Sequence, residues 1–265
     1  MSPKILKYWL IFKTQLLNSL AYPGDLLLRS LSIVFFMWVF VHLWRAVYGS
    51  AGQSAIAGLT LSDTLWYLLL SETLILSKPR LARTIAEMVK DGSVAHLLNK
   101  PYNFLLYHAS VWMGDSLSFM GFNLLAGGAI VWWLVGPPPD PRGWPFVLVV
   151  MVAAWLLDFC VTAMIGLAAF VTEDVAAFEW IYSKLLFIMG GMLIPLDFFP
   201  AWLRSAAQAL PFAYTIYGPA RFFVQPEPGR FVSLLLGQLL WLAVLGGLLV
   251  FIYRKGITRL AINGG

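Results

Sequence analysis

Six long apolar stretches constrain the fold of this chain more than any other feature. They cover residues 26–46, 59–77, 104–135, 144–171, 181–197 and 231–253. A helix needs about 20 mostly apolar residues to cross about 30 Å of hydrocarbon. Charged residues make up only 12% of the chain, about half of the share in soluble domains. The sequence therefore predicts an all-α integral membrane protein, with six transmembrane helices in a single transmembrane domain over residues 1–265.

The 18 Lys and Arg residues are distributed unevenly between the two sides that six spans define. Most of them fall at the termini, in the segment 78–101 and at the start of the fifth stretch, which share one side. Basic residues mark the cytoplasmic side. We therefore expect a multi-pass protein of the bacterial cytoplasmic (inner) membrane with both termini in the cytoplasm. The net charge of +5 does not indicate nucleic-acid binding, because the distribution of the basic residues is that of a membrane protein with a defined orientation.

Two segments outside the spans are too apolar for ordinary loops. Residues 1–25 mix lysines with aliphatic and aromatic residues, which predicts an interfacial elbow helix. Residues 198–225 contain two short helical stretches, about 200–209 and 212–224, separated by proline and rich in aromatic residues. We interpret them as a re-entrant helical hairpin in the outer leaflet, because such backbone is tolerated when it is buried against protein.

The segment 78–101, "KPRLARTIAEMVKDGSVAHLLNKP", is a charged interruption between two apolar stretches. Leu81, Ile85 and Met88 recur at helical spacing, and the charges occupy the other faces. The "DG" at 91–92 is typical of a helix end. The segment is either a structural loop whose charges hold the topology or a docking helix for a cytoplasmic partner.

The order of these elements resembles the ABC-2 type permeases, the membrane subunits of one class of ATP-binding-cassette exporters. The resemblance covers the whole chain. It is strongest in the pattern E-x-x-x-D-G-(x)5-L-N-K-P from Glu87 to Pro101 and in "FFPAWL…LPF.Y" before the last span. The branch with two permeases and a separate ATPase is the most similar.

This resemblance implies a role for the segment 78–101. In the family the loop between spans two and three is the coupling helix, which sits in a cleft of the ATPase and transmits its movement to those spans. It would place Glu87, Met88, Lys90, Asp91 and Gly92 at the contact. The acidic residues Glu173, Asp174 and Glu179 form either a second, weaker contact or a plain turn.

The resemblance also implies the partners. The chain has no G-x-x-x-x-G-K-[ST] phosphate loop. ATP and Mg would therefore bind to a separate cytoplasmic ATPase, present in two copies, and this chain would carry no cofactor of its own. A second permease, identical or homologous, would complete the exporter, in contact with membrane lipid. The cargo would be a hydrophobic or amphiphilic compound such as a drug, a lipid or a secondary metabolite, as in multidrug efflux.

Several polar residues lie inside the apolar stretches, where they indicate function by default. Trp112, Asp115 and Asp158 are candidates for the substrate path, because Trp112 and Asp115 share a helical face and Asp158 lies near mid-span. The alternative for Asp158 is an interhelical hydrogen bond, for example to Asn123. An intramembrane enzyme using Asp115, Asp158 and His108 is a second hypothesis, although we find no metal spacing and no defined nucleophile.

Glycine pairs recur in the apolar stretches, at positions 127–128, 190–191 and 246–247. Small residues let helices approach closely inside a membrane. We therefore expect close helix packing at all three pairs.

Overall fold

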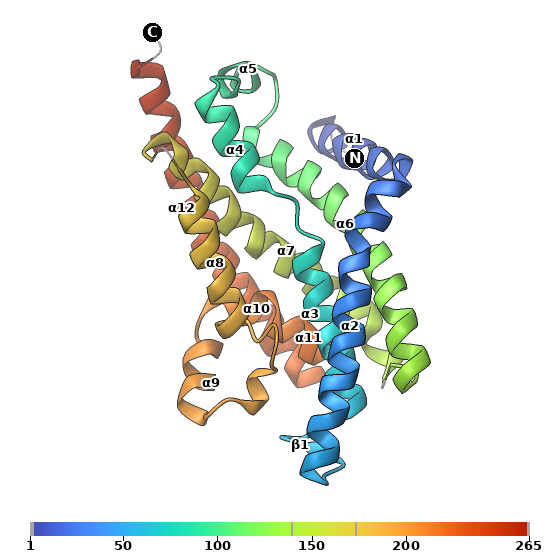
Figure 1. Cartoon of the computed structure of the whole chain (residues 1–265). Coiled ribbons are helices and arrows are strands. Elements are labelled where there is room, and N and C mark those ends of the chain that lie inside the picture. Colours follow the sequence, from blue (N-terminus) through green and yellow to red (C-terminus); the bar gives the residue numbers. More distant parts are fainter. Residues whose placement is uncertain (1–2, 139, 173, 264–265) are drawn as a thin grey trace.

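The computed structural model describes residues 3–138, 140–172 and 174–263, and these residues are mostly helical (Figure 1). The α-helices are α1 (Pro3–Ala21), α2 (Pro23–Ala51), α3 (Leu61–Leu76), α4 (Leu81–Lys90), α5 (Val94–Leu98), α6 (Phe104–Val135), α7 (Trp144–Leu167), α8 (Ala176–Met189), α9 (Ala201–Gln208), α10 (Pro211–Thr215), α11 (Tyr217–Val224) and α12 (Pro228–Asn263). Three 3-10 turns are η1 (Pro141–Gly143), η2 (Ala168–Phe170) and η3 (Leu196–Phe198). The strands β1 (Ala55–Ile56) and β2 (Leu59–Thr60) pair antiparallel.

Four of the described helices are long and apolar enough to cross a membrane. They cover Leu26–Ala51, Phe104–Val135, Trp144–Phe170 and Pro228–Gly256. Helices α3 and α8, in the second and fifth stretches, have 16 and 14 residues, which at 1.5 Å per residue is about 24 Å and about 21 Å. The prediction of an all-α membrane protein is confirmed, and the six-span arrangement stays a prediction.

Helix α8 differs from the predicted fifth span. It begins earlier, at Ala176, and ends at Met189. Gly190 follows as the helix cap, and Gly191 has a φ of +68°, in the left-handed region that favours glycine. The chain therefore leaves the helix at the glycine pair, and residues 190–195 connect it to η3.

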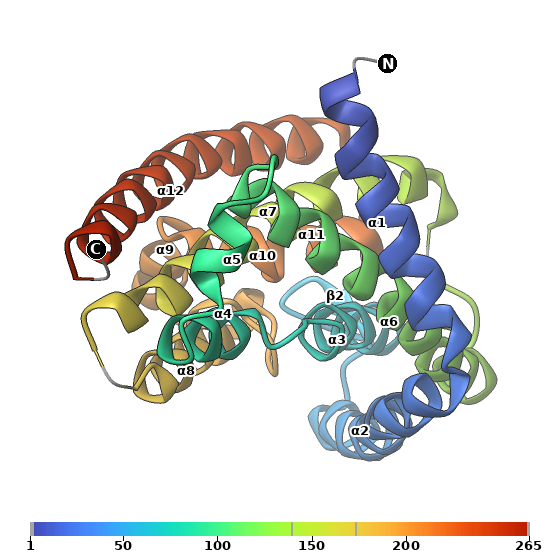
Figure 2. The ribbon, with the colours of Figure 1, turned by 90° about the horizontal axis from the view of Figure 1, so that it is seen from above.

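The helices form two sets that meet along the middle of the molecule (Figure 2). In the first set α6 packs on α1, α2 and α3; in the second set α7 packs on α12 and α4. Helix α11 contacts both α3 and α7 and so bridges the two sets. A Cβ at Gly127 would lie 2.5 Å from Leu69 Cδ1, so the close packing predicted there is confirmed. At Gly246 and Gly247 the same position meets nothing within 4 Å, so no close packing occurs there among the described residues of this chain.

The two ends of the molecule differ in what they carry (Figure 1). Helices α1, α4 and α5 lie at one end, together with the last turns of α12; we call this the α4 end. The β1–β2 hairpin and α9 lie at the other end, which we call the hairpin end. The start of α1 and the end of α12 thus lie at the same end of the molecule, and the placement of both termini in the cytoplasm stays a prediction.

The connections at the hairpin end are more ordered than the sequence suggests. Ala57 and Gly58 have positive φ values of 49° and 80°, as in the turns that join two-residue hairpins. Thr60 and Asp63 form a reciprocal capping box that starts α3. The predicted re-entrant segment forms three short helices, α9 to α11, because the backbone breaks at Ile216 between α10 and α11.

Candidate coupling surface and intramembrane polar groups

Helix α4 has one buried face that docks on α7. Its buried residues are Leu81, Ala82, Ile85 and Ala86. They approach α7 at Gly166, where a Cβ would lie 2.8 Å from Ile85 Cβ and 3.0 Å from the Ala82 carbonyl oxygen. Any side chain at this position would push the two helices apart. The glycine therefore fixes α4 tightly on α7.

The five predicted coupling residues lie at the C-terminal end of α4. Glu87, Lys90, Asp91 and Gly92 are exposed, and Met88 is half-buried. Gly92 has a φ of +78° with nothing within 4 Å of its Cβ position, so it is the backbone conformation that requires glycine there. Hydrogen bonds from Ser93, including one from its backbone N–H at 2.8 Å, lower the pKa of Asp91, so its carboxylate stays ionised to a lower pH than usual.

A cavity of about 220 Å³ separates α4 from the start of α8. It is lined by Arg83, Ala86, Glu87, Lys90, Asp174, Val175 and Ala176. Beside it, Arg83 Nε donates to Glu179 Oε2 at 2.8 Å, and this hydrogen bond raises the pKa of Arg83. Glu179 thus contacts α4 within the chain, and Glu173 lies outside the described residues.

The linker between α3 and α4 is tied to α7 and α8 through Asp158. This aspartate is fully buried, and its Oδ1 forms an ion pair with Lys78 of the linker. Tyr182 of α8 donates its hydroxyl to the same oxygen at 2.7 Å. The predicted alternative, a hydrogen bond between Asp158 and Asn123, does not form. The Asn123 amide instead donates to Ser77 Oγ at 3.1 Å. Asp158 therefore joins three elements.

The family resemblance implies that α4 passes movement to the spans before and after it, and the packing of α4 adds contacts with other helices. Helix α4 is joined to α3 by a short linker and to α6 through α5, and α3 and α6 lie in the second and third predicted spans. Outside the segment 78–101, however, α4 packs on α7 and η2, and Arg83 binds Glu179 of α8. The sequence does not indicate these contacts, since Gly166 and Glu179 lie far along the chain from α4.

Trp112 and Asp115 have different neighbours in spite of their shared helical face. Asp115 Oδ1 accepts hydrogen bonds from Gln15 Nε2 at 2.8 Å and Ser19 Oγ at 2.6 Å, so it holds α1 on α6. Trp112 is buried against Phe159 of α7, with ring centroids 5.4 Å apart. Each candidate of the substrate path thus has a protein partner, and a role in binding cargo stays a prediction.

Two further polar groups are buried in the predicted spans. Glu72 is 1% exposed, and neither of its carboxylate oxygens has a hydrogen-bond partner among the described residues. His108 is stacked edge-on with Phe104, with ring centroids 4.4 Å apart. Within the described part of the chain, no group of three His, Cys, Asp or Glu residues could hold a metal ion.

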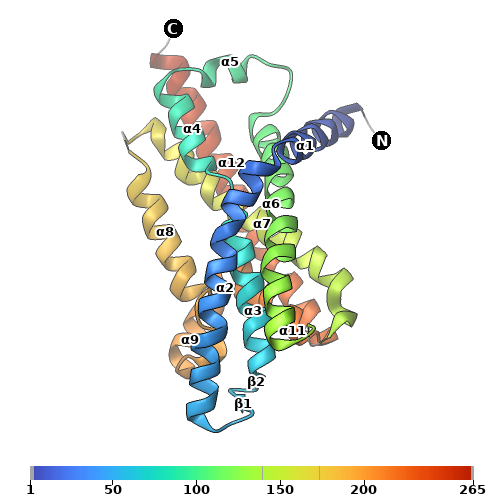
Figure 3. The ribbon, with the colours of Figure 1, turned by 45° about the vertical axis from the view of Figure 1, so that its right-hand side comes forward.

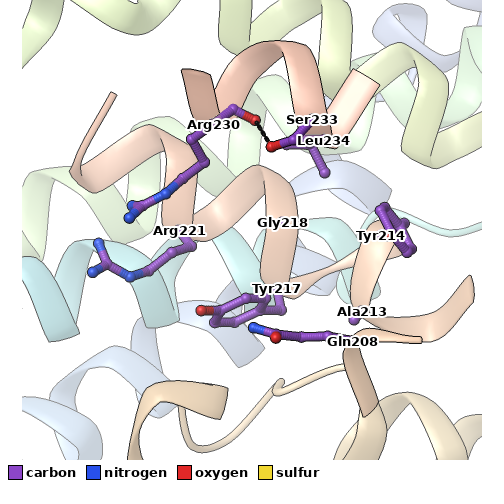
Figure 4. A pocket seen from close by; sticks show the side chains of 9 residues that line it. All are labelled: Gln208, Ala213, Tyr214, Tyr217, Gly218, Arg221, Arg230, Ser233 and Leu234. Atoms are coloured by element: carbon purple, nitrogen blue, oxygen red, sulfur yellow. Dashed lines mark hydrogen bonds between the residues drawn. The ribbon is translucent and has the colours of Figure 1, made fainter. Parts of the chain in front are cut away.

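At the hairpin end a cavity of about 320 Å³ lies between α10, α11 and the start of α12. Figure 4 shows the guanidinium groups of Arg221 and Arg230 on the same side of it. Arg221 is buried, and its Nε donates to both oxygens of Asp197 at 3.2 Å. Its Nη1 donates to Gln225 Oε1 at 2.6 Å. These contacts fix α11 to η3, a role of Arg221 that sequence reasoning missed.

This architecture is that of a multi-pass α-helical membrane protein whose charged helix is held on the bundle at one end. The chain belongs to the ABC-2 transporter family: the family model described as ABC-2 family transporter protein matches residues 26–264. Proteins of this family are the membrane components of transporters, they are not themselves catalytic, and they generally work with an ATPase partner. No curated protein matches the chain.

Proposed function

We propose that the chain is the permease subunit of an ATP-driven exporter and that α4 is the helix on which the ATPase acts. One observation carries this proposal: the buried face of α4 is fixed on α7 at Gly166, while its C-terminal end presents exposed charges. A helix that only held the topology would not need a fixed seat on another span. A helix that transmits a push needs both features.

The contacts support a specific route for that movement. The ATPase contacts Glu87 to Gly92, and α4 passes the displacement to α7 through the close approach at Gly166. The Arg83–Glu179 ion pair carries it to the start of α8. The Lys78–Asp158 ion pair keeps the α3–α4 linker on α7 during the movement.

The remaining parts of the proposal follow the family. Two copies of a cytoplasmic ATPase bind ATP and Mg, a second permease, identical or homologous, pairs with this one, and the chain itself carries no cofactor. Six spans cross the bacterial inner membrane, with α3 and α8 as the two shorter ones and both termini in the cytoplasm. Helices α9 to α11 form the re-entrant hairpin. The cargo is a hydrophobic or amphiphilic compound that is moved outward.

The intramembrane-enzyme hypothesis has less support. Asp115 contacts α1, Asp158 contacts the α3–α4 linker and α8, and His108 stacks on Phe104 of its own helix. An acid, a base and a nucleophile must lie within hydrogen-bond reach of one another. These three groups point to different neighbours, so a shared reaction site is not favoured.

The test uses the complex purified with its ATPase. We expect Glu87→Ala combined with Lys90→Ala to weaken ATPase binding about tenfold, about 1.4 kcal/mol, and to reduce the ATP hydrolysis that the permease stimulates. Glu227→Ala is the matched control, because Glu227 is an exposed carboxylate (62% exposed) in the connection before α12. Equal binding and equal hydrolysis in all three proteins would contradict the proposal.

A further inference from the structure

An apolar groove of about 850 Å³ lies between α6 and α7. Its floor consists of Trp66 and Leu70 from α3, Met120 and Gly128 from α6, and Phe223 from α11. Its walls are the apolar side chains of α6 and of the start of α7, and the lining carries few polar atoms. The volume is within the range of about 300–1,000 Å³ that is typical of ligand sites.

The groove exists because α6 and α7 belong to different helix sets. Helix α6 runs beside α2 and α3 (Figure 3), whereas α7 packs on α4 and α12. Between the two sets, Trp66 is held at the floor by a hydrogen bond from its indole Nε1 to the Gly136 carbonyl oxygen at 3.2 Å. An unfilled space of this size would forfeit the dispersion contacts of its whole lining.

The mouth of the groove is continuous with the surface that faces the membrane. Leu125 and Trp133 on α6 are 75% and 84% exposed, and Leu148 on α7 is 58% exposed. All three line the groove as well. Large apolar side chains with this exposure on predicted spans contact lipid, so hydrocarbon chains have direct lateral access to the groove.

The end of the groove is suited to a lipid headgroup. Trp132, Trp133 and Trp144 lie at the hairpin end of α6 and α7, where such residues mark the membrane–water boundary. Arg142 lies two residues before Trp144 and lines a neighbouring cavity of about 420 Å³ rather than the groove itself, and its side chain is 88% exposed. Its Nη2 pairs with Asp140 at 2.7 Å, and a guanidinium has further donors for a phosphate oxygen.

We propose that one acyl chain of a phospholipid, from the leaflet at the hairpin end, occupies the groove between α6 and α7, with its phosphate beside Arg142. The lining is apolar and the mouth opens on the lipid-facing surface, which suits a flexible hydrocarbon chain. The lipid supplies the packing between the two helix sets that the side chains leave unmade. It is a structural ligand of the protein, distinct from the transported cargo.

Two equally buried tryptophans provide the first test. Trp66 and Trp155 are both 5% exposed, but only Trp66 lines the groove. The full-length protein is reconstituted in phosphatidylcholine brominated at mid-chain, which quenches nearby indoles. The contribution of each tryptophan is the difference in fluorescence between wild type and the variant that lacks it. We expect the brominated lipid to quench the contribution of Trp66, which Trp66→Phe removes. We expect it to leave the contribution of Trp155, which Trp155→Phe removes, unquenched. If both contributions are unquenched, the groove is empty or filled by protein, and the proposal is wrong.

Filling the groove provides the second test and does not depend on folding of the Trp66→Phe variant. Ala129 is exposed and lines the groove, so Ala129→Phe occupies the space of the chain. Ala243→Phe places the same side chain on an exposed position of α12, away from the groove. By native mass spectrometry we expect Ala129→Phe to retain one phosphatidylcholine fewer per chain than wild type, and Ala243→Phe to retain as many. Equal retention in all three would overturn the proposal.

Discussion

At the scale of single residues, Gly92 shows how one backbone conformation ends the candidate coupling helix. Its φ of +78° costs a residue with a Cβ about 1–2 kcal/mol, and its surroundings leave space for a side chain. We therefore expect Gly92→Ala to loosen the turn after α4 through the backbone alone. Hydrogen exchange of the amides after Lys90 should accelerate roughly tenfold for each 1.4 kcal/mol by which the substitution lowers the free energy of opening this turn.

The control for this substitution is Gly92→Asn. Asparagine adopts the left-handed conformation more readily than alanine. The exchange rates should therefore increase in the order glycine, asparagine, alanine. If alanine and asparagine behave alike, the conformation of the backbone is not what limits the turn.

The buried Lys78–Asp158 pair belongs to the same scale. The side chain of Asp158 is 1% exposed and that of Lys78 is 17% exposed, so neither charge is well solvated. Removing one partner of such a pair costs about 3–5 kcal/mol, because the other charge stays buried and unpaired. We expect Asp158→Asn to lower the midpoint of thermal unfolding of the purified protein. Tryptophan fluorescence measures this midpoint.

The double variant Lys78→Met with Asp158→Leu separates this role from a role in binding cargo. It removes both charges, and most of the lost stability should return. If Asp158→Asn instead leaves the midpoint unchanged and abolishes transport, the carboxylate acts on the cargo.

The sequence could mark Asp158 as important but could not identify its partners. A carboxylate in an apolar stretch is a costly residue, and that signal is local. Lys78 is 80 positions away and was assigned to the cytoplasmic loop by the count of basic residues. Its long side chain reaches the aspartate from the end of α3. Such a contact depends on how α3 and α7 are placed in space, which one sequence does not specify.

At the scale of elements, the contact of α4 with α7 depends on the absence of a side chain at Gly166. Alanine favours a helix over glycine by about 1 kcal/mol, so Gly166→Ala would stabilise an isolated α7. In the folded chain, however, the added Cβ would lie 2.8 Å from Ile85 Cβ. We expect Gly166→Ala to lower the thermal midpoint and to reduce ATP hydrolysis stimulated by the permease.

Gly246→Ala is the matched substitution on α12. Nothing lies within 4 Å of the Cβ position at Gly246, so the gain in helix propensity should raise the midpoint. If both alanine variants gain stability, α4 is not seated on α7 as the structure has it.

Helix existence could be predicted from the sequence more reliably than helix length or packing. The apolar stretches gave the positions of α2, α6, α7 and α12, and the amphipathic spacing gave α4. The second stretch forms a shorter helix because its residues 59–60 lie in β2 and Ser77 is the C-cap, whereas Gly190 ends α8 before its apolar sequence ends. The glycine pairs look alike in sequence, yet Gly127 meets a neighbouring helix, Gly191 has a positive φ, and Gly246 meets nothing within 4 Å.

At the scale of the whole molecule, the division into two helix sets links the proposed coupling helix to the lipid groove. Helix α4 is seated on α7 of the second set, whereas its linkers continue into α3 and α6 of the first set. A displacement of α4 would therefore shift one set relative to the other. The groove lies at the same boundary, between α6 and α7. A flexible acyl chain there can keep the boundary filled while the two sets move.

The orientation of the molecule leads to a prediction that two exposed serines can test. Ser93 lies after α4 at the α4 end, and Ser54 lies before β1 at the hairpin end. Each is replaced by cysteine in a Cys160→Ala background; the natural cysteine is buried. Because basic residues gather at the α4 end, that end should face the cytoplasm. A membrane-impermeant maleimide should label Ser54→Cys in intact cells and Ser93→Cys only after permeabilisation. The reverse pattern would place α4 outside the cell, where a cytoplasmic ATPase could not reach it.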